Sequence, residues 1–366
     1  MPDPQNRAAP ITSVATTDIS RMLHPQPRGR RMPMRGFDEE FVDIADYIIR
    51  ITDRIWHERK IDLCHRYYAA DSMIHTLAGD IVGADVVEAN THATLAAFPD
   101  RTLDGDNVIW AGNEDDGYYS SHLITSKMTN LGPSEFGPAT GRHARIRTIA
   151  DCVCKENLIV EEWLMRDNAG LVLQLGLDPH SVALDQAKAD RETGSLLTDY
   201  VAPLIDRTRN TQQGAAGPVD TPEENIEGFV AHVFGEIWGK QNLDALPALY
   251  DFRVGAHLTA NRDLYGTKEL SSYFADLFSV LSDIRVTVDH VASIPYLGAA
   301  KDVAVRWSLA ATHSGDGLFG PATGAPIYIL GASHWRLING RIREEWTVFD
   351  EVALLRQIAS HRLAQQ

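Results

Sequence analysis

Two aspartates end a repeated tryptophan-containing segment and could act as a general acid or base. Asp167 ends LIVEEWLMRD and Asp350 ends RIREEWTVFD, each four residues after a tryptophan. In a β-strand the first segment would present two faces, one with Glu161, Trp163, Met165 and Asp167 and the other with Glu162, Leu164 and Arg166. We expect the face with Trp163 to line an apolar pocket, where desolvation raises a carboxyl pKa toward neutrality. Alternatively, either aspartate caps the helix expected after it.

Three histidines are further candidates for proton transfer. His75 lies in SMIHTL, His257 in GAHLT and His122 in YYSSHLITSKM. A histidine can relay a proton or hold a substrate oxygen at physiological pH. His75 and His257 could instead be hydrogen-bonded core residues. His122 is expected to occupy the position that Arg306 has in the second half of the chain, which predicts two different pockets and favours the first half as the active one.

His334 is not expected to belong to the site, although it stands beside a tryptophan. The dipeptide Asn339-Gly340 is typical of a tight hairpin turn. A two-residue turn there would pair His334 with Glu345 and point it away from Trp346. We therefore expect His334 at an interface or on the surface.

No motif in the sequence indicates a metal or a cofactor. The three cysteines Cys64, Cys152 and Cys154 form no CxxC pair, and buried reduced thiols are the expectation. The sequence also lacks the glycine-rich phosphate-binding patterns and the GxSxG motif of serine hydrolases. These observations favour cofactor-independent proton-transfer chemistry.

The chain repeats itself. FGPATG occurs at 136–141 and again at 319–324, and EEW occurs at 161–163 and again at 344–346. Each EEW begins 25 residues after the start of its FGPATG. Matching spacing between several anchors predicts a tandem duplication.

Each copy is predicted to be an α+β domain in which helices pack on a curved antiparallel sheet. Apolar residues recur at helical spacing in FVDIADYIIRITDRIW and ENIEGFVAHVFGEIW, and later segments alternate as strands do. The expected division is an irregular N-terminal arm at 1–36, domain 1 at 37–178, a connecting helix and linker at 179–220, and domain 2 at 221–361. The FGPATG loops, which offer no acid, base or strong nucleophile, are expected to be scaffold.

Composition argues for a small-molecule partner. The net charge of −16 repels phosphate backbones and anionic membranes, so nucleic acid and membrane are not expected partners. The N-terminal residues lack the apolar core of a signal peptide, and no apolar stretch is long enough to span a bilayer. The expected location is the cytoplasm.

Both copies resemble the SnoaL-like polyketide cyclases of the nuclear-transport-factor-two-like superfamily, which also contains ketosteroid isomerase and scytalone dehydratase. The resemblance rests on FGPATGR and IVEEWLMRDNAGLVLQLG in copy one, and on VRWSLAATHSGDGLFGPATG and IREEWTVFDEVALLRQI in copy two. It implies two tandem cone-shaped α+β barrel domains. It also implies that Asp167 and Asp350 occupy the position of the cyclases' catalytic acid or base.

The resulting hypothesis is a cofactor-independent enzyme that makes or breaks a carbon–carbon bond in a hydrophobic, aromatic molecule. The expected substrate-binding residues are Trp56, Tyr118, Trp163, Met165, Arg306 and Trp346. The superfamily leaves isomerase and dehydratase chemistry open, and a non-catalytic ligand-binding protein is the rival from another class. In a further alternative, copy two only closes the pocket of copy one. The two domains are expected to form an intramolecular pseudo-dimer, which further homo-oligomers could extend.

Overall fold

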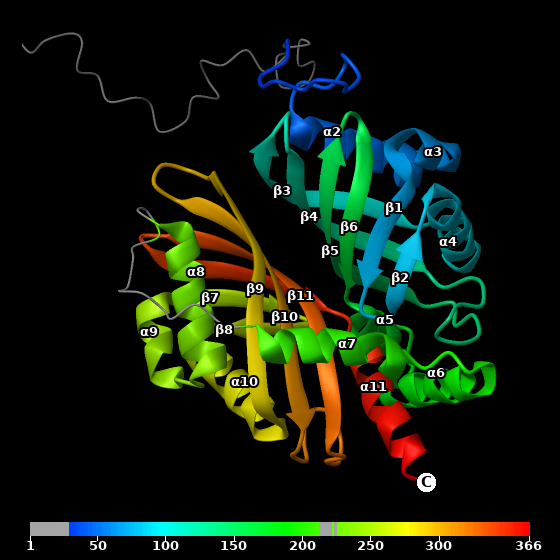
Figure 1. The fold of residues 1–366 in the computed structure, drawn as a ribbon, viewed down its shortest axis with the longest axis vertical. Helices are drawn as coiled ribbons and strands as arrows, with labels where there is room; N and C mark the ends of the chain where they lie inside the picture. Colours follow the sequence, from blue (N-terminus) through cyan, green and yellow to red (C-terminus); the bar gives the residue numbers. More distant parts are fainter. Residues whose placement is uncertain (1–28, 212–221, 223–224) are drawn as a thin grey trace, which may run out of the picture.

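The chain folds into two similar halves, each a six-stranded sheet with helices on one face. The computed structural model describes residues 29–211, 222 and 225–366. Figure 1 shows the sheet of domain 1 above that of domain 2, with helices near the junction. The predicted α+β class and the tandem arrangement are confirmed.

Domain 1 places its strands in the order β2-β1-β6-β5-β4-β3. Strand β1 pairs in parallel with β6, and the other neighbours are antiparallel. The strands are β1 (Tyr68–Thr76), β2 (Gly79–Val82), β3 (Thr102–Asn113), β4 (Gly117–Thr129), β5 (His143–Lys155) and β6 (Leu158–Arg166). The helices are α2 (Ile44–Thr52), α3 (Cys64–Tyr67), α4 (Ala84–Ala97) and α5 (Asn168–Gln174).

Helix α2 illustrates how the sequence specifies these elements. Asp43 caps its first turn by accepting a hydrogen bond from the Asp46 backbone N–H at 2.8 Å. Ile44, Ile48 and Ile51 follow at helical spacing and are buried against the sheet. A π-helical turn (Asp53–His57) then carries Trp56 over the same face.

Domain 2 repeats this topology with the order β8-β7-β12-β11-β10-β9. Its strands are β7 (Tyr250–Leu258), β8 (Arg262–Tyr265), β9 (Leu281–Pro295), β10 (Lys301–His313), β11 (Ala325–Ile338) and β12 (Arg341–Phe349). Its helices are α8 (Ile226–Phe234), α9 (Leu246–Leu249), α10 (Gly266–Val280) and α11 (Glu351–Ala364). The strand registers of the two halves match at an offset of 183 residues, so positions in one domain can be assigned to the other.

The connecting segment forms two helices, α6 (Pro179–Thr193) and α7 (Leu197–Asn210). The linker expected after them falls almost entirely at 212–221, outside the described residues, as do residues 1–28 of the expected arm. Residues 29–36 contain no helix or strand. They pack on domain 1, where Met34 is buried and the Pro33 carbonyl accepts a hydrogen bond from the Tyr118 hydroxyl.

The FGPATG loops join β4 to β5 and β10 to β11, and Phe136 of the first loop also lines a pocket. Gly137 and Gly141 in the first loop, and Gly320 and Gly324 in the second, have positive φ angles that disfavour other residues. The Asn130 side chain accepts a hydrogen bond from the Thr140 N–H at 2.8 Å and closes the first loop.

The two sheets pack against each other through their helix-free faces, and α7 contributes to the contact. An apolar interdomain cluster joins side chains from both domains and α7, among them Leu123, Ile149, Met165, Val201, Tyr328 and Leu330. Polar groups cross the same interface, where His334 Nε2 lies 2.7 Å from Ser121 Oγ. The Ser121 hydroxyl also donates to Asp151, which stands at the position in domain 1 that His334 has in domain 2.

In the described part of the chain, no helix is both long and apolar enough to cross a membrane.

Candidate functional site

Domain 1 encloses a cavity between its sheet and helices α2 and α4. The cavity has a volume of about 90 Å³ and a mostly aliphatic lining that includes Ile48, Ile51, Ile74 and Ile124. Trp56, an expected substrate-binding residue, is part of the wall, and its indole N–H lies 3.4 Å from Thr91 Oγ1. The helices therefore leave the curved sheet incompletely filled.

A larger vestibule of about 500 Å³ adjoins the cavity at the end of the sheet near β2. Both hollows share Arg101, Leu164 and Arg166 in their walls, so these residues stand between them. Domain 2 completes the vestibule with Asp350 and Arg356, at the N-terminal half of α11. The site is thus formed by both halves of the chain.

His122 on β4 is the buried imidazole of the cavity. Its Nε2 has no hydrogen-bond partner, and burial lowers the pKa of His122 to about 4, so the ring is neutral at pH 7. Gly105 makes room for it, because a Cβ at that position would lie 2.7 Å from His122 Nε2. A neutral imidazole facing an apolar cavity can accept a proton from a bound molecule.

Two arginines flank the opening between cavity and vestibule. Arg101 precedes β3 and Arg166 ends β6, and the Nε atom of each is buried without a hydrogen-bond partner. Among the described residues, neither has a carboxylate oxygen within 4.0 Å. Burial, with a smaller contribution from the charge of Arg166, lowers the pKa of Arg101 to about 9.

The cavity also holds a hydrogen-bonded carboxyl and a free hydroxyl. The Tyr68 hydroxyl donates to Glu162 Oε2 at 2.9 Å, and burial raises the pKa of Glu162. Domain 2 has the same pair, in which Tyr250 donates to Glu345 at 3.0 Å. A pair present in both halves is explained by the fold, whereas the Thr148 hydroxyl of domain 1 is buried without a partner and is available to a ligand.

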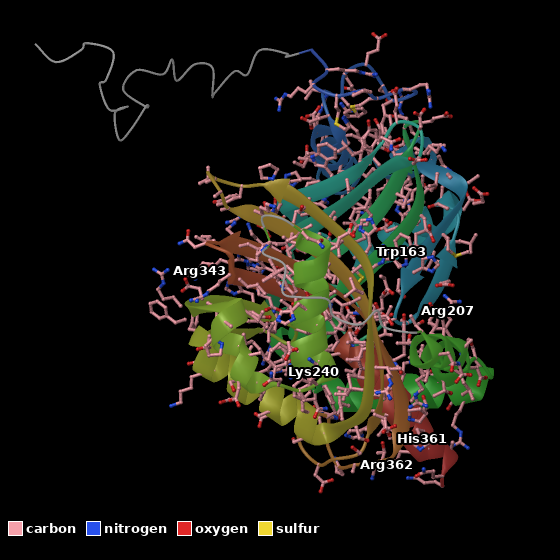
Figure 2. All side chains as sticks on the ribbon, turned by 60° about the vertical axis from the view of Figure 1, so that its left-hand side comes forward. Trp163, Arg207, Lys240, Arg343, His361 and Arg362 are labelled. Carbon is pink, nitrogen blue, oxygen red and sulfur yellow. The ribbon has the colours of Figure 1, made fainter. Side chains whose placement is uncertain are left out.

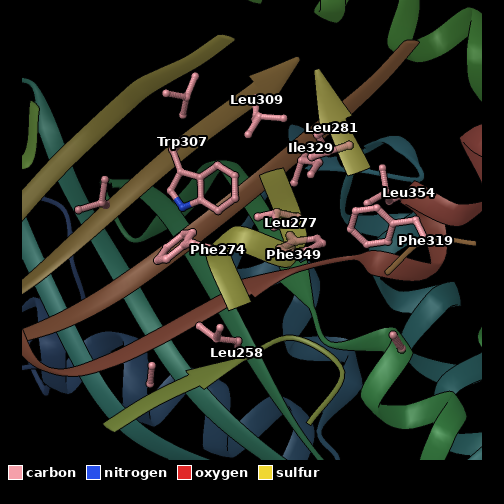
Figure 3. Close-up of a cluster of buried hydrophobic side chains, with 14 of the residues drawn as sticks. Leu258, Phe274, Leu277, Leu281, Trp307, Leu309, Phe319, Ile329, Phe349 and Leu354 are labelled. Carbon is pink, nitrogen blue, oxygen red and sulfur yellow. The ribbon is translucent and has the colours of Figure 1, made fainter. Parts of the chain in front are cut away.

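The corresponding interior of domain 2 is filled with large apolar side chains. Figure 3 shows Trp307, Phe274, Leu277 and Phe349 in one buried cluster. The register assigns Val305 to the position of His122, Trp307 to Ile124, Gly331 to Thr148, Trp335 to Cys152, Phe349 to Arg166 and Ile284 to Arg101. At these positions the histidine and the two arginines occur in domain 1, and domain 2 has apolar residues in their place.

This register corrects the expectation that His122 and Arg306 are counterparts. Arg306 corresponds to Leu123, one residue further on, and successive residues of a strand point to opposite faces. Arg306 consequently faces domain 1 at the interface, with its guanidinium 3.7 Å from Asp151 and 3.5 Å from the centre of the Trp163 ring. The expected difference between the two pockets does exist, with valine in place of histidine.

Asp167 is the N-cap of α5 and does not line the cavity. Its carboxylate accepts hydrogen bonds from the N–H groups of Gly170 at 2.8 Å and Ala260 at 2.7 Å, the latter from domain 2. Burial raises the pKa of Asp167, and these hydrogen bonds oppose the shift. The capping alternative is confirmed for Asp167. Its carboxylate oxygens accept hydrogen bonds from backbone N–H groups.

Asp350 also caps its helix, α11, but it faces the vestibule of domain 1. It accepts hydrogen bonds from the Ala353 N–H at 3.0 Å and from the Asn168 side chain at 2.5 Å. Burial raises the pKa of Asp350 to about 7. Of the two aspartates, the one in domain 2 is therefore closer to the candidate site.

The alternation of faces predicted for β6 is confirmed, but the cavity lies on the other face. Glu162, Leu164 and Arg166 line it, while Trp163 and Met165 face domain 2. Figure 2 marks the place of Trp163 in the molecule. The helices cover the face that carries Glu162, because the opposite face of the sheet packs against the second sheet.

His75 and His257 occupy equivalent places on the helix-free faces of their sheets. The His75 ring stacks on Trp163 and contacts Asp80 at 2.9 Å and Glu161 at 3.1 Å. The His257 ring stacks on Trp346 and contacts Asp263 at 2.6 Å. The structure brings each histidine to a tryptophan and acidic residues, and it does not bring either histidine to the cavity.

Two other expectations are resolved by packing. Tyr118 is buried beneath residues 29–37 and is not part of the cavity wall. His334 lies at the interdomain interface, as one alternative predicted, but it pairs with Trp346 rather than Glu345. The predicted pairing was wrong because a bulge after Arg336 shifts the register by one residue.

Sequence reasoning did not select Glu162, Arg166, Arg101 or Thr148 as site residues. The first two were recognised as one face of a strand, and their polarity within an otherwise apolar segment was the available signal. Arg101 and Thr148 carried no such signal, because neither residue differs from an exposed arginine or strand threonine in its local sequence.

Two six-stranded sheets, each curved around helices that cover one face, define a pair of cone-shaped α+β domains. A family model for the SnoaL-like polyketide cyclases matches residues 46–175 and 228–358. The chain therefore belongs to the SnoaL-like polyketide cyclase family and contains two copies of its domain.

Solved structures similar to this chain each match about one domain's length. IdmH from Streptomyces antibioticus is 21% identical, with 36% of this chain and 98% of that chain covered and a TM-score of 0.32. TsrD from Streptomyces laurentii is 17% identical, with 36% and 94% covered and a TM-score of 0.32. A SnoaL-like polyketide cyclase from Agrobacterium tumefaciens is 18% identical, with 36% and 95% covered and a TM-score of 0.29. The search of curated proteins found no match.

Proposed function

We propose that this protein is a cofactor-independent acid–base enzyme that makes or breaks a carbon–carbon bond in a hydrophobic, aromatic molecule. Its active site would be the cavity of domain 1. The observation that carries the proposal is the neutral, buried His122, whose Nε2 has no partner and which domain 2 replaces with valine. A wholly apolar interior would have favoured a ligand carrier instead.

In this mechanism His122 removes a proton from a carbon next to a substrate carbonyl. The electron pair of the broken C–H bond forms an enolate, whose oxygen can accept a hydrogen bond from the Thr148 hydroxyl. The enolate carbon then attacks a second carbonyl carbon, and the resulting alkoxide takes the proton back from the His122 imidazolium. The same steps in reverse cleave a β-hydroxy carbonyl compound, so one site serves either aldol ring closure or retro-aldol release of an aldehyde.

Domain 2 would serve as the structural partner in an intramolecular pseudo-dimer. Its α11 closes the vestibule and places Asp350 there, where a carboxyl with a pKa of about 7 can exchange protons with solvent or substrate. This division of labour agrees with the expectation that copy one is the active half. Of the two aspartates expected in the site, Asp350 rather than Asp167 borders it.

The test is deuterium incorporation. The full chain is incubated in deuterated water with a panel of aromatic polyketides and hydroxyketones, and substrate and product masses are followed. We expect exchange or a new product with the wild type and a loss of at least about 100-fold in His122→Asn. His92→Asn is the matched control, because that side chain is exposed on α4. An unchanged rate in His122→Asn would refute the assignment, and loss of water from the product would identify a dehydratase instead.

A further inference from the structure

Two arginines at the mouth of the cavity, neither of which has a carboxylate partner among the described residues, identify a property of the ligand. Arg101 and Arg166 line both the cavity and the vestibule, and each has a buried Nε atom without a partner. Burying a guanidinium without a counter-charge is unfavourable, and two adjacent ones also repel each other. An arrangement of this kind is relieved by a bound anion.

No acidic group nearby forms an ion pair with either arginine among the described residues. Burial raises the pKa of Glu162, and the charge of Arg166, from beyond ion-pair distance, lowers that pKa by a smaller effect. Glu162 accepts its hydrogen bond from Tyr68, and the same Tyr–Glu pair in domain 2 is maintained where Phe349 replaces Arg166. Asp350 is held by Asn168 and by the N-terminus of α11. Glu135 is exposed at the rim of the vestibule, and no carboxylate lies within ion-pair distance of either arginine among the described residues.

A third arginine of the vestibule shows the contrast. Arg356 on α11 is paired with Asp190 on α6, with Nε 2.7 Å from the carboxylate. The chain therefore pairs one arginine of this space with a carboxylate and leaves two without one, although Arg101 also donates a long hydrogen bond, 3.5 Å, to the Ser126 hydroxyl. A nonspecific attraction of anions does not explain these two arginines, because the molecule has a net charge of −16 and as a whole repels anions.

We propose that the ligand is an aromatic carboxylic acid, with its apolar part in the cavity and its carboxylate bound by Arg101 and Arg166. The planar guanidinium matches a carboxylate through paired N–H donors. The aliphatic wall of the cavity suits the rings, and the arginines stand where the ligand would emerge from it. The proposal shares its site with the proposed enzymatic function and specifies the substrate class.

The experiment compares an acid with its neutral isostere. Binding of 2-naphthoate and 2-naphthamide to the full chain is measured by isothermal titration calorimetry. We expect the wild type to bind the acid at least about tenfold more tightly. The preference should shrink in Arg101→Gln and Arg166→Gln and disappear in the double variant. Arg285→Gln is the matched control, because Arg285 follows Ile284, the counterpart of Arg101, and is exposed.

Several results would overturn the proposal. These are equal affinity for acid and amide, no binding of the acid, or a preference that survives in the double variant. Tighter binding of 2-naphthylphosphonate than of 2-naphthoate would replace the carboxylate with a phosphate-like group. If the double variant does not fold, as its thermal unfolding would show, the acid–amide comparison in the wild type decides.

The outcome is separable from that of the proposed function. Selective acid binding without deuterium exchange on any acidic substrate would refute the enzyme and leave the ligand class standing. Deuterium exchange with neutral ketones, without any preference for binding acids, would refute the ligand class and leave the enzymatic function standing.

Discussion

The two domains share a fold but differ in what fills it. Both contain a Tyr–Glu hydrogen bond at the equivalent place in their sheets, between Tyr68 and Glu162 in domain 1 and between Tyr250 and Glu345 in domain 2. Around that pair, domain 1 keeps a cavity with a histidine and two arginines, whereas domain 2 packs aromatic rings. The fold therefore does not dictate the interior chemistry, and the residues that differ at equivalent positions are the functional candidates.

The two interiors also differ in how much their side chains contribute to stability. Burying a large aromatic or aliphatic side chain contributes about 1.5–3 kcal/mol, and domain 2 gains this at Trp307, Trp335 and Phe349. Domain 1 has Ile124, Cys152 and Arg166 at those positions, and the buried Nε atom of Arg166 has no partner. Unpaired buried groups reduce stability, which is typical of a site shaped for a ligand.

Exchanging residues between the two interiors gives the largest expected effect. Ile124→Trp with Thr148→Gly copies Trp307 and Gly331 into domain 1, where the indole would occupy the cavity. We expect deuterium exchange to fall by at least about 100-fold because substrate is excluded and the Thr148 hydroxyl is lost. Thermal unfolding should show that the fold is retained.

The reverse exchange is the control. Trp307→Ile with Gly331→Thr opens the interior of domain 2 and should cost about 3–5 kcal/mol of stability, as Trp truncations do. The exchange rate per folded molecule should stay the same. Activity that survives the first exchange, or vanishes only in the second, would place the active site outside domain 1.

Much of the fold could be predicted because it depends on local patterns that occur twice. Helical spacing in the segments before Trp56 and Trp238, strand alternation and the paired FGPATG loops all agree with the structure. The predicted single connecting helix became two, α6 and α7, because the chain breaks at Gly194, which has a positive φ angle.

The site was harder to predict, because strand alternation separates two faces without saying which one the helices cover. Trp163 looked like the wall of an apolar pocket, yet it contacts Arg306 from the second domain. Arg166, on the other face, lines the cavity. The alignment of His122 with Arg306 failed for a related reason, since an error of one residue exchanges the faces of a strand.

The two capping aspartates provide a second test of the comparison, through pH. The folded-state pKa of Asp350 is about 7 and its unfolded value about 3.9. The native state therefore holds the proton more tightly, and stability falls as the pH rises from about 4 to 7, by on the order of 4 kcal/mol. Asp350→Asn removes this loss, so its unfolding temperature relative to wild type should rise over that range and then level off.

Asp167→Asn is the matched variant in domain 1. Asp167 accepts hydrogen bonds from Gly170, Ala260 and Asn261, and an amide can only accept at one of its two terminal atoms. Because the amide loses some of these hydrogen bonds, we expect Asp167→Asn to gain less stability at high pH than Asp350→Asn does. A flat pH profile for Asp350→Asn minus wild type would show that Asp350 titrates normally and has no proton to offer the vestibule.

A single added methyl group gives the smallest expected effect and tests how tightly domain 2 is filled. A Cβ at Gly331 would overlap the Trp307 indole, so Gly331→Ala should cost about 1–3 kcal/mol through overpacking. The same position in domain 1 is Thr148, which borders the cavity, and Thr148→Val replaces only an unpartnered hydroxyl with a methyl group. It should therefore leave stability within about 0.5 kcal/mol of wild type. Chemical denaturation of both variants measures the difference, and equal losses would mean that the two interiors are packed alike.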